Sequence, residues 1–149
     1  MKQSILSLLC VALSFCSAGM AAASGEPLAH ANGLVIQPPA GFAPARTERG
    51  FHLEESGSLR NPRRIDIELS SVSPAPGLAR KRWGSEQMVY RIDQSEGGSG
   101  GNEYRLWAAK SSEPYWIVVT ATVQHEGGAP AFTETWNLLE LACIQEKQK

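Results

Sequence analysis

The chain has 149 residues and a formal net charge of −1, with 14 basic and 15 acidic side chains. That balance gives no reason to expect nucleic acid or an anionic membrane surface as the partner. The length suits a single domain that is large enough to bury a core of its own.

The N-terminus has the pattern of an export signal. Lys2 precedes an apolar run from Ile5 to Phe15, which is too short to span a bilayer as a helix. Small residues follow and end in an Ala-x-Ala pattern at Ala23, so cleavage before Ser24 is predicted. The predicted organisation is therefore a signal peptide at 1–23 and a single α+β domain at 24–149.

A lipoprotein signal is the alternative interpretation of the same segment. The stretch Leu13-Ser14-Phe15-Cys16 resembles a lipobox, but Phe15 is bulky where such sites carry a small residue. This mismatch favours a periplasmic protein without an anchor, and membrane attachment is expected only if Cys16 is lipidated. Because signal cleavage removes Cys10 and Cys16, Cys143 is predicted to be an unpaired, buried residue, and the fold must rest on its core.

Short strands are predicted in the first half of the domain, after a loose polar lead-in at 24–33. The run Leu34-Val35-Ile36 is apolar and is followed by two prolines, which suits an edge strand. Phe51 and Leu53 alternate with polar residues and indicate a weak second strand. Segment 64–69 alternates cleanly, which predicts a strand with one buried face and one wet face.

A long hairpin is predicted next, with arms near 88–92 and 104–108. Between the arms lies the segment SEGGSGGNE at 95–103, which we call the finger. Its predicted tip, Ser95 to Asn102, is longer than a tight hairpin requires. No Lys-Ser/Thr pair follows it and no helix begins there, so a P-loop is excluded. Two interpretations stay open, a disordered hairpin end and a polar loop that enters another molecule's cleft.

The last predicted elements are a strand and a helix. Residues 115–123 are apolar on both faces, which predicts a central strand that is covered on each side. Pro130 suits the first residue of a helix, and apolar residues recur at helical spacing from Phe132 to Cys143. The sequence therefore predicts an α+β fold, with a twisted antiparallel sheet of about five or six strands and a C-terminal helix packed on one face.

The residues show no catalytic or metal-binding pattern. His125 and Glu126 are adjacent and would face opposite sides of a strand, and no HExxH or CxxC motif occurs. Asp66 and Glu68 share a strand face as a glycosidase pair could, but their alternation with isoleucines favours a solvated face. The basic cluster at 60–64 lacks the glycine-rich helix start of a phosphate site. The chain is therefore predicted not to be an enzyme and to need no cofactor or metal.

Several stretches resemble known families. In order, GLVIQPPAGF, RRIDIELSS, a long hairpin, YWIVVTATVQ and an apolar terminal helix resemble the PsbP-like fold. The stretches NGLVIQPPAGF, GFHLEESGSLRNPRRIDIEL and EGGSGGNEY resemble the periplasmic immunity proteins of type VI secretion systems. This resemblance implies a periplasmic antidote that forms an inhibitory complex with a secreted, peptidoglycan-cleaving muramidase, and it leaves open whether calcium takes part.

The predicted partner contacts come from the finger argument. They are Glu96, Ser99, Asn102 and Glu103 on the finger, with Glu54, Glu55, His125 and Glu126 in neighbouring loops. These residues are expected to fill the substrate groove of the toxin. The alternative function is a PsbP-like accessory or ligand-binding domain of an envelope complex, and a small hydrolase is a third and weaker alternative.

Overall fold

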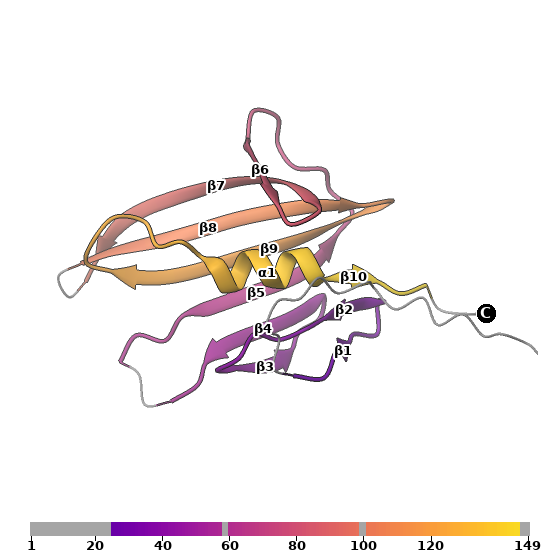
Figure 1. The fold of residues 1–149 in the computed structure, drawn as a ribbon, viewed down its shortest axis with the longest axis horizontal. Coiled ribbons are helices and arrows are strands. Elements are labelled where there is room, and N and C mark those ends of the chain that lie inside the picture. The colour runs from indigo at the N-terminus through magenta and orange to yellow at the C-terminus, as the bar shows by residue number, and fades with distance from the viewer. Residues whose placement is uncertain (1–24, 58–59, 99–100, 147–149) are drawn as a thin grey trace, which may run out of the picture.

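The computed structural model describes residues 25–57, 60–98 and 101–146, and its fold is α+β (Figure 1). The large sheet is antiparallel, with seven strands in the order β3 (Phe42–Arg46), β4 (Gly50–Glu55), β5 (Arg64–Ser70), β9 (Tyr115–His125), β8 (Gly101–Ser112), β7 (Glu86–Gly97) and β6 (Ala79–Trp83). A smaller sheet has the order β1 (Leu28–Ala29), β2 (Leu34–Ile36) and β10 (Cys143–Ile144). The single helix of the described residues is α1 (Thr133–Leu141). The predicted antiparallel sheet with a C-terminal helix is confirmed, with more strands than the five or six expected.

The additional strands of the large sheet lie at its two edges, where the sequence shows little apolar alternation. β3 contains Pro44 and leaves four of its five residues exposed, and β6 carries the basic run Arg80-Lys81-Arg82. Charges and proline are common on edge strands because both discourage pairing with another chain. The edge strands are therefore the ones that a search for buried alternation misses.

Leu34–Ile36 forms a strand as predicted, but it is not an edge strand. It pairs with β1 on one side and β10 on the other, and all three of its residues are buried. The lead-in that was predicted to be loose supplies β1. The prolines at 38 and 39 end this strand and do not mark an unpaired side.

The core lies between α1 and one face of the large sheet. In Figure 1, α1 runs across β9, and the helix also contacts β6. This inner face presents Ile67, Val119 and Leu106, which are buried together with Trp136 and Leu139 of the helix. The apolar side chains of β2 belong to the same cluster, so the small sheet extends the layer that covers the inner face.

The outer face of the large sheet is mostly wet, as the alternation at 64–69 predicts. Asp66 is exposed and is hydrogen-bonded to His52, with 2.7 Å between Asp66 Oδ1 and His52 Nδ1. The prediction that both faces of β9 are covered holds on this side only near Val118. That residue is buried, and it lines a hollow together with the loop at 72–78.

The C-terminal predictions need two corrections. The helix begins at Thr133 and not at Pro130, because Phe132 has φ 53°, a left-handed conformation that does not continue a helix. Cys143 lies in β10 and is disulfide-bonded, so the prediction of an unpaired core cysteine on the helix is wrong. That prediction assumed removal of the segment that carries the other two cysteines. Within the described ranges, no helix is long and apolar enough to cross a bilayer.

Candidate partner-binding site

Three segments that are distant in sequence meet at one end of the large sheet. The register pairs Arg64 of β5 with Thr122 of β9, and Asn102 of β8 with His125 of β9. The loop that follows β4, the finger and the turn that follows β9 therefore lie at the same end, on the left of Figure 1. We call the described residues of these three segments the loop end; they are 56–57 and 60–63, 95–98 and 101–103, and 125–128.

The two arms of the finger pair further toward its tip than the sequence predicted. β7 continues to Gly97 and β8 starts at Gly101, and their ladder pairs Glu96 with Asn102. The predicted eight-residue tip is therefore wrong, because a ladder of backbone hydrogen bonds needs no apolar side chains. A Cβ at Gly97 would lie only 2.9 Å from the carbonyl oxygen of Gly101, so glycine permits the close approach near the tip. Ser99 lies outside the described residues.

The predicted contact residues divide between the two faces of the sheet. Asn102 is the ladder partner of both Glu96 and His125, so these three residues share one face. Glu103 points to the opposite face, because successive strand residues alternate. Glu54 is likewise opposite to Glu55, its neighbour on β4. The loop end therefore presents polar side chains to both sides of the sheet edge.

A polar hollow of about 510 Å³ lies between the three segments. It is lined by Arg60, Asn61, Gly97, Gly101, Gln124, His125 and Glu126. His125 and Glu126 were predicted from sequence, whereas Arg60, Asn61 and Gln124 were not. The basic cluster at 60–64 was the available signal, but only the sheet register places it opposite the finger. The hollow combines a guanidinium, a carboxylate, an imidazole and amide groups in one concave surface.

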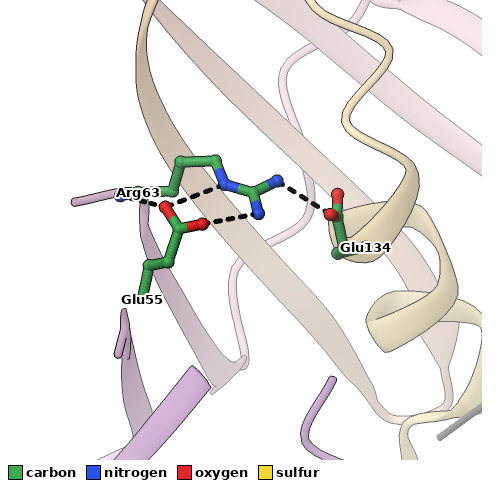
Figure 2. Close-up of polar contacts among 3 residues, drawn as sticks. All are labelled: Glu55, Arg63 and Glu134. Atoms are coloured by element: carbon green, nitrogen blue, oxygen red, sulfur yellow. Dashed lines mark hydrogen bonds and ion pairs between the residues drawn. The ribbon is translucent and has the colours of Figure 1, made fainter. Parts of the chain in front are cut away.

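Glu55 is bound within the protein by a bridge at the base of this site, shown in Figure 2. The Nε and Nη2 groups of Arg63 donate to the two carboxylate oxygens of Glu55 at 3.1 and 2.9 Å. Arg63 Nη1 donates to Glu134 Oε1 at 2.8 Å. We call Glu55, Arg63 and Glu134 the Arg63 bridge. It connects the loop after β4 to the first turn of α1.

The bridge shifts the acidities of its members. The hydrogen bond from Arg63 lowers the pKa of Glu55, against the opposing effect of burial. Burial alone would raise the pKa of Glu134, but hydrogen bonding and the charge of Arg63 leave that pKa lowered. Both carboxylates are therefore ionised at neutral pH, and each loses its charge at a lower pH than an ordinary glutamate does.

The turn after β9 is held by two further hydrogen bonds. The buried Tyr104 donates its hydroxyl to the carbonyl oxygen of Gly127 at 2.7 Å, which links the finger strand β8 to the turn. The backbone N–H of Gly127 donates to His125 Nδ1 at 3.1 Å.

Glu54 and Glu103 are held more weakly than Glu55. Each forms a solvent-facing ion pair with a neighbouring arginine, at 3.1 Å and 3.7 Å.

The geometry of the loop end can be set beside known proteins. Residues 35–142 match the family model described as the Type six secretion immunity 3 domain, Tsi3. The chain belongs to this family. The Tsi3 match includes every segment of the loop end and all of α1.

One relative and one solved structure extend this result. The "Immune protein Tsi3" of Pseudomonas aeruginosa PAO1 is 43% identical over 145 residues, which span 97% of this chain and 100% of that protein. A crystal structure from Bacteroides thetaiotaomicron has a TM-score of 0.57 at 9% identity. It matches 77% of this chain, which spans only 46% of that structure, so the likeness concerns the fold alone.

Membership of the Tsi3 family makes the chain a type VI secretion immunity protein, and such a protein binds a cognate toxin effector. The described residues hold no group of three or more histidine, cysteine, aspartate or glutamate side chains that could hold a metal ion. What the loop end offers chemically is a concave, mixed-charge surface with glycine-lined backbone at its rim. That surface suits contact with another protein.

Proposed function

We propose that this Tsi3-family protein acts in the periplasm, where it binds a muramidase effector and occludes the substrate groove of that enzyme with the loop end. The observation that supports this most is the convergence of the finger, the 56–63 loop and the 125–128 turn around one polar hollow. A groove that holds a glycan strand is elongated and polar. A narrow two-stranded finger beside a polar hollow has a complementary shape.

The finger and the hollow would contribute different contacts. On the finger, glycines allow the backbone to approach the groove closely, while Glu96 and Asn102 supply an acceptor and an amide. In the hollow, Arg60 is exposed and has no ion pair among the described residues, so it can pair with an acidic group of the effector. Glu126 offers the opposite charge from the same hollow. Charges of both signs would fix the register of the complex as well as its affinity.

The choice of target and compartment rests on the sequence. The stretches quoted above resemble antidotes of peptidoglycan-cleaving muramidases, and residues 1–23 have the pattern of an export signal. Peptidoglycan lies in the periplasm, so an antidote exported there meets the toxin at its substrate. The alternative is a lipoprotein signal, in which case the exported protein would be anchored to the membrane through Cys16.

Co-expression tests this proposal. The cognate effector is directed to the periplasm of a bacterial host, together with either the full chain or a chain that lacks residues 1–23. The full chain should restore growth and the truncated chain should not. In parallel, the purified full chain, which keeps the partner of the Cys143 disulfide, should stop the effector from cleaving isolated peptidoglycan at about one-to-one stoichiometry. Full protection by the leaderless chain, or a stable complex whose muramidase activity is undiminished, would contradict the proposal.

A further inference from the structure

The Arg63 bridge joins the base of one wall of the hollow to the start of α1, the helix that follows another wall. Its first arm closes the base of the loop at 56–63. There the backbone N–H of Glu55 also donates to the carbonyl oxygen of Arg63, and the backbone N–H of Arg63 donates to the Glu55 carboxylate. That loop carries Arg60 and Asn61 into the hollow. Its second arm reaches Glu134, at the start of the helix that follows the turn after His125. The two arms therefore connect segments that are 71 positions apart in the sequence.

The bridge is only partly buried, but its geometry is tightly defined. The side chains of Arg63, Glu55 and Glu134 keep 34%, 23% and 39% of their exposure. The Arg63 guanidinium lies over the ring of Phe42, with its Cζ atom 5.2 Å from the ring centroid, and Phe42 is buried in the core. A two-point contact to one carboxylate, combined with an aromatic ring under the guanidinium, fixes both the position and the plane of the arginine.

We infer that Arg63 is a positioning residue for toxin binding, because its bridge ties the base of the loop that carries Arg60 and Asn61 to the start of α1. The bridge thereby fixes these loop residues against the helix that follows the 125–128 turn before the toxin arrives. This inference rests on the proposed function, since it assumes that the loop end is the binding surface. If a protein adopts its binding-competent arrangement only part of the time, its apparent affinity is reduced in proportion to the fraction of molecules in that arrangement. The bridge raises the fraction by removing the freedom of the loop in advance.

The central experiment measures the affinity of the domain for its cognate effector in three variants. Arg63→Ala removes both arms of the bridge and should weaken binding about 5- to 10-fold. Arg49→Ala is the matched control, because it removes an arginine whose Nη2 lies 3.2 Å from Glu68 Oε2, on β5 near the other end of the strand. That control should bind within about twofold of the unchanged domain. Glu134→Gln weakens only the helix arm of the bridge, so it serves as the test variant if Arg63→Ala fails to fold. It should reduce the affinity less than Arg63→Ala does.

A second readout separates positioning from direct contact. Amide hydrogen exchange of the free Arg63→Ala domain should become faster at 56–63 and 125–132, and should not change in the Arg49→Ala domain. Equal affinities of the Arg63→Ala and Arg49→Ala variants would overturn the inference. A loss of affinity with unchanged exchange in the free protein would also overturn it, because Arg63 would then act by touching the effector.

The same experiment distinguishes failure of this inference from failure of the proposed function. A domain with a shortened finger is measured beside the arginine variants. If that domain loses binding while Arg63→Ala retains it, the loop end is the binding surface and the positioning role is wrong. If the domain with the shortened finger and the Arg63→Ala domain both bind normally, the proposed binding surface is wrong and the inference falls with it.

Discussion

The middle and the start of α1 are held by different chemistry. In the middle of the helix, the ring of Trp136 stacks on Trp83 at 6.1 Å, and the indole N–H of Trp83 donates to Asn137 at 2.8 Å. At its start, the buried Phe132 provides no side-chain cap, and a partly exposed ion pair joins Glu134 to Arg63. The middle of the helix is attached by buried aromatic surface, whereas its start adds polar groups that water can reach.

A buried amine accentuates this difference. Lys110 is 5% exposed and donates to the carbonyl oxygen of Glu140 in the last turn of α1 at 2.7 Å. Burial lowers the pKa of Lys110, and Glu86, whose carboxylate lies 3.5 Å away, opposes that shift. A cation at a helix C-terminus is favoured by the helix dipole. We infer that the contacts of α1 from Trp136 to its last turn carry much of the stability of the fold, whereas the loop end is free to serve recognition.

The largest expected effect on stability is in the middle of α1. Trp136→Ala should lower the free energy of unfolding by about 3–5 kcal/mol, the usual cost of emptying a buried tryptophan site. Trp136 is 3% exposed, and it contacts Trp83 and Tyr90. Denaturant unfolding measures the change. Trp107→Ala is the control, since this half-buried tryptophan lies outside the core cluster and should cost clearly less. Equal costs would contradict the assignment of the core to the helix face.

The next effect concerns binding at the loop end. Replacing Glu96–Asn102 by Asn-Gly leaves the ladder pair Ser95↔Glu103 closed by a two-residue turn, a geometry that hairpins favour. The unfolding midpoint should barely move, since loop length changes closure entropy by only about 0.6 kcal/mol per doubling. Binding of the effector should weaken by about 2 kcal/mol or more if the finger lies at the centre of the interface. A shortened domain that still inhibits fully would exclude the finger from the interface. It would leave recognition to the 56–63 loop and the 125–128 turn if Arg63→Ala weakens binding, and would place it outside the loop end if Arg63→Ala does not.

Lys110→Met gives an intermediate effect on stability. The substitution keeps a long side chain but leaves the carbonyl oxygen of Glu140 without its donor and the helix terminus without its cation. We expect a loss of about 1–3 kcal/mol in the free energy of unfolding. Arg105→Met is the comparison on the same strand, because Arg105 is exposed, and it should change stability by less than about 0.5 kcal/mol. An unchanged midpoint for Lys110→Met would mean that the amine contributes nothing to the attachment of the helix.

The smallest expected effect is the pH dependence of the Arg63 bridge. Glu55 and Glu134 have lowered pKa values in the folded protein, so the stability they contribute is present above the ordinary value of 4.5 and is lost as pH falls through the folded pKa values. Solvent screening limits this contribution to about 1 kcal/mol. The difference in unfolding free energy between the unchanged domain and Arg63→Ala should be constant near pH 7 and should shrink below about pH 4.5. A difference that grows in acid would contradict the assignment.

The sequence predicted those parts of the molecule in which local pattern decides structure. Alternation at 64–69 and at 115–123 identified β5 and β9, because a strand buried on one face must repeat with a period of two. The finger was predicted as a loop because glycine has no side chain to show alternation, although its backbone continues the ladder to Gly97. The position of β2 between β1 and β10 depends on pairing with the two ends of the chain, which no local pattern records.

The candidate binding site was predictable only in part, for the same reason. Glu96, Asn102 and Glu126 stand out because polar residues beside glycines mark exposed turns. The contact between Arg63 and Glu134 joins residues 71 positions apart, and the sequence gives no indication of which carboxylate the arginine selects. Glu55 was predicted to face the partner, and its carboxylate is engaged by Arg63. The finger could be recognised from adjacent residues, whereas the Arg63 bridge depends on contacts between residues that are distant in sequence.

The central claim is that the loop end is the surface that binds the effector. Amide hydrogen exchange of the domain, with and without its cognate effector, tests this directly. We expect the complex to protect residues 54–63, 95–104 and 124–128, and to leave exchange unchanged around the last turn of α1 and the turn between β6 and β7. Protection of the outer-face loop at 71–78 or of β6, with exchange at the loop end unchanged, would contradict the account.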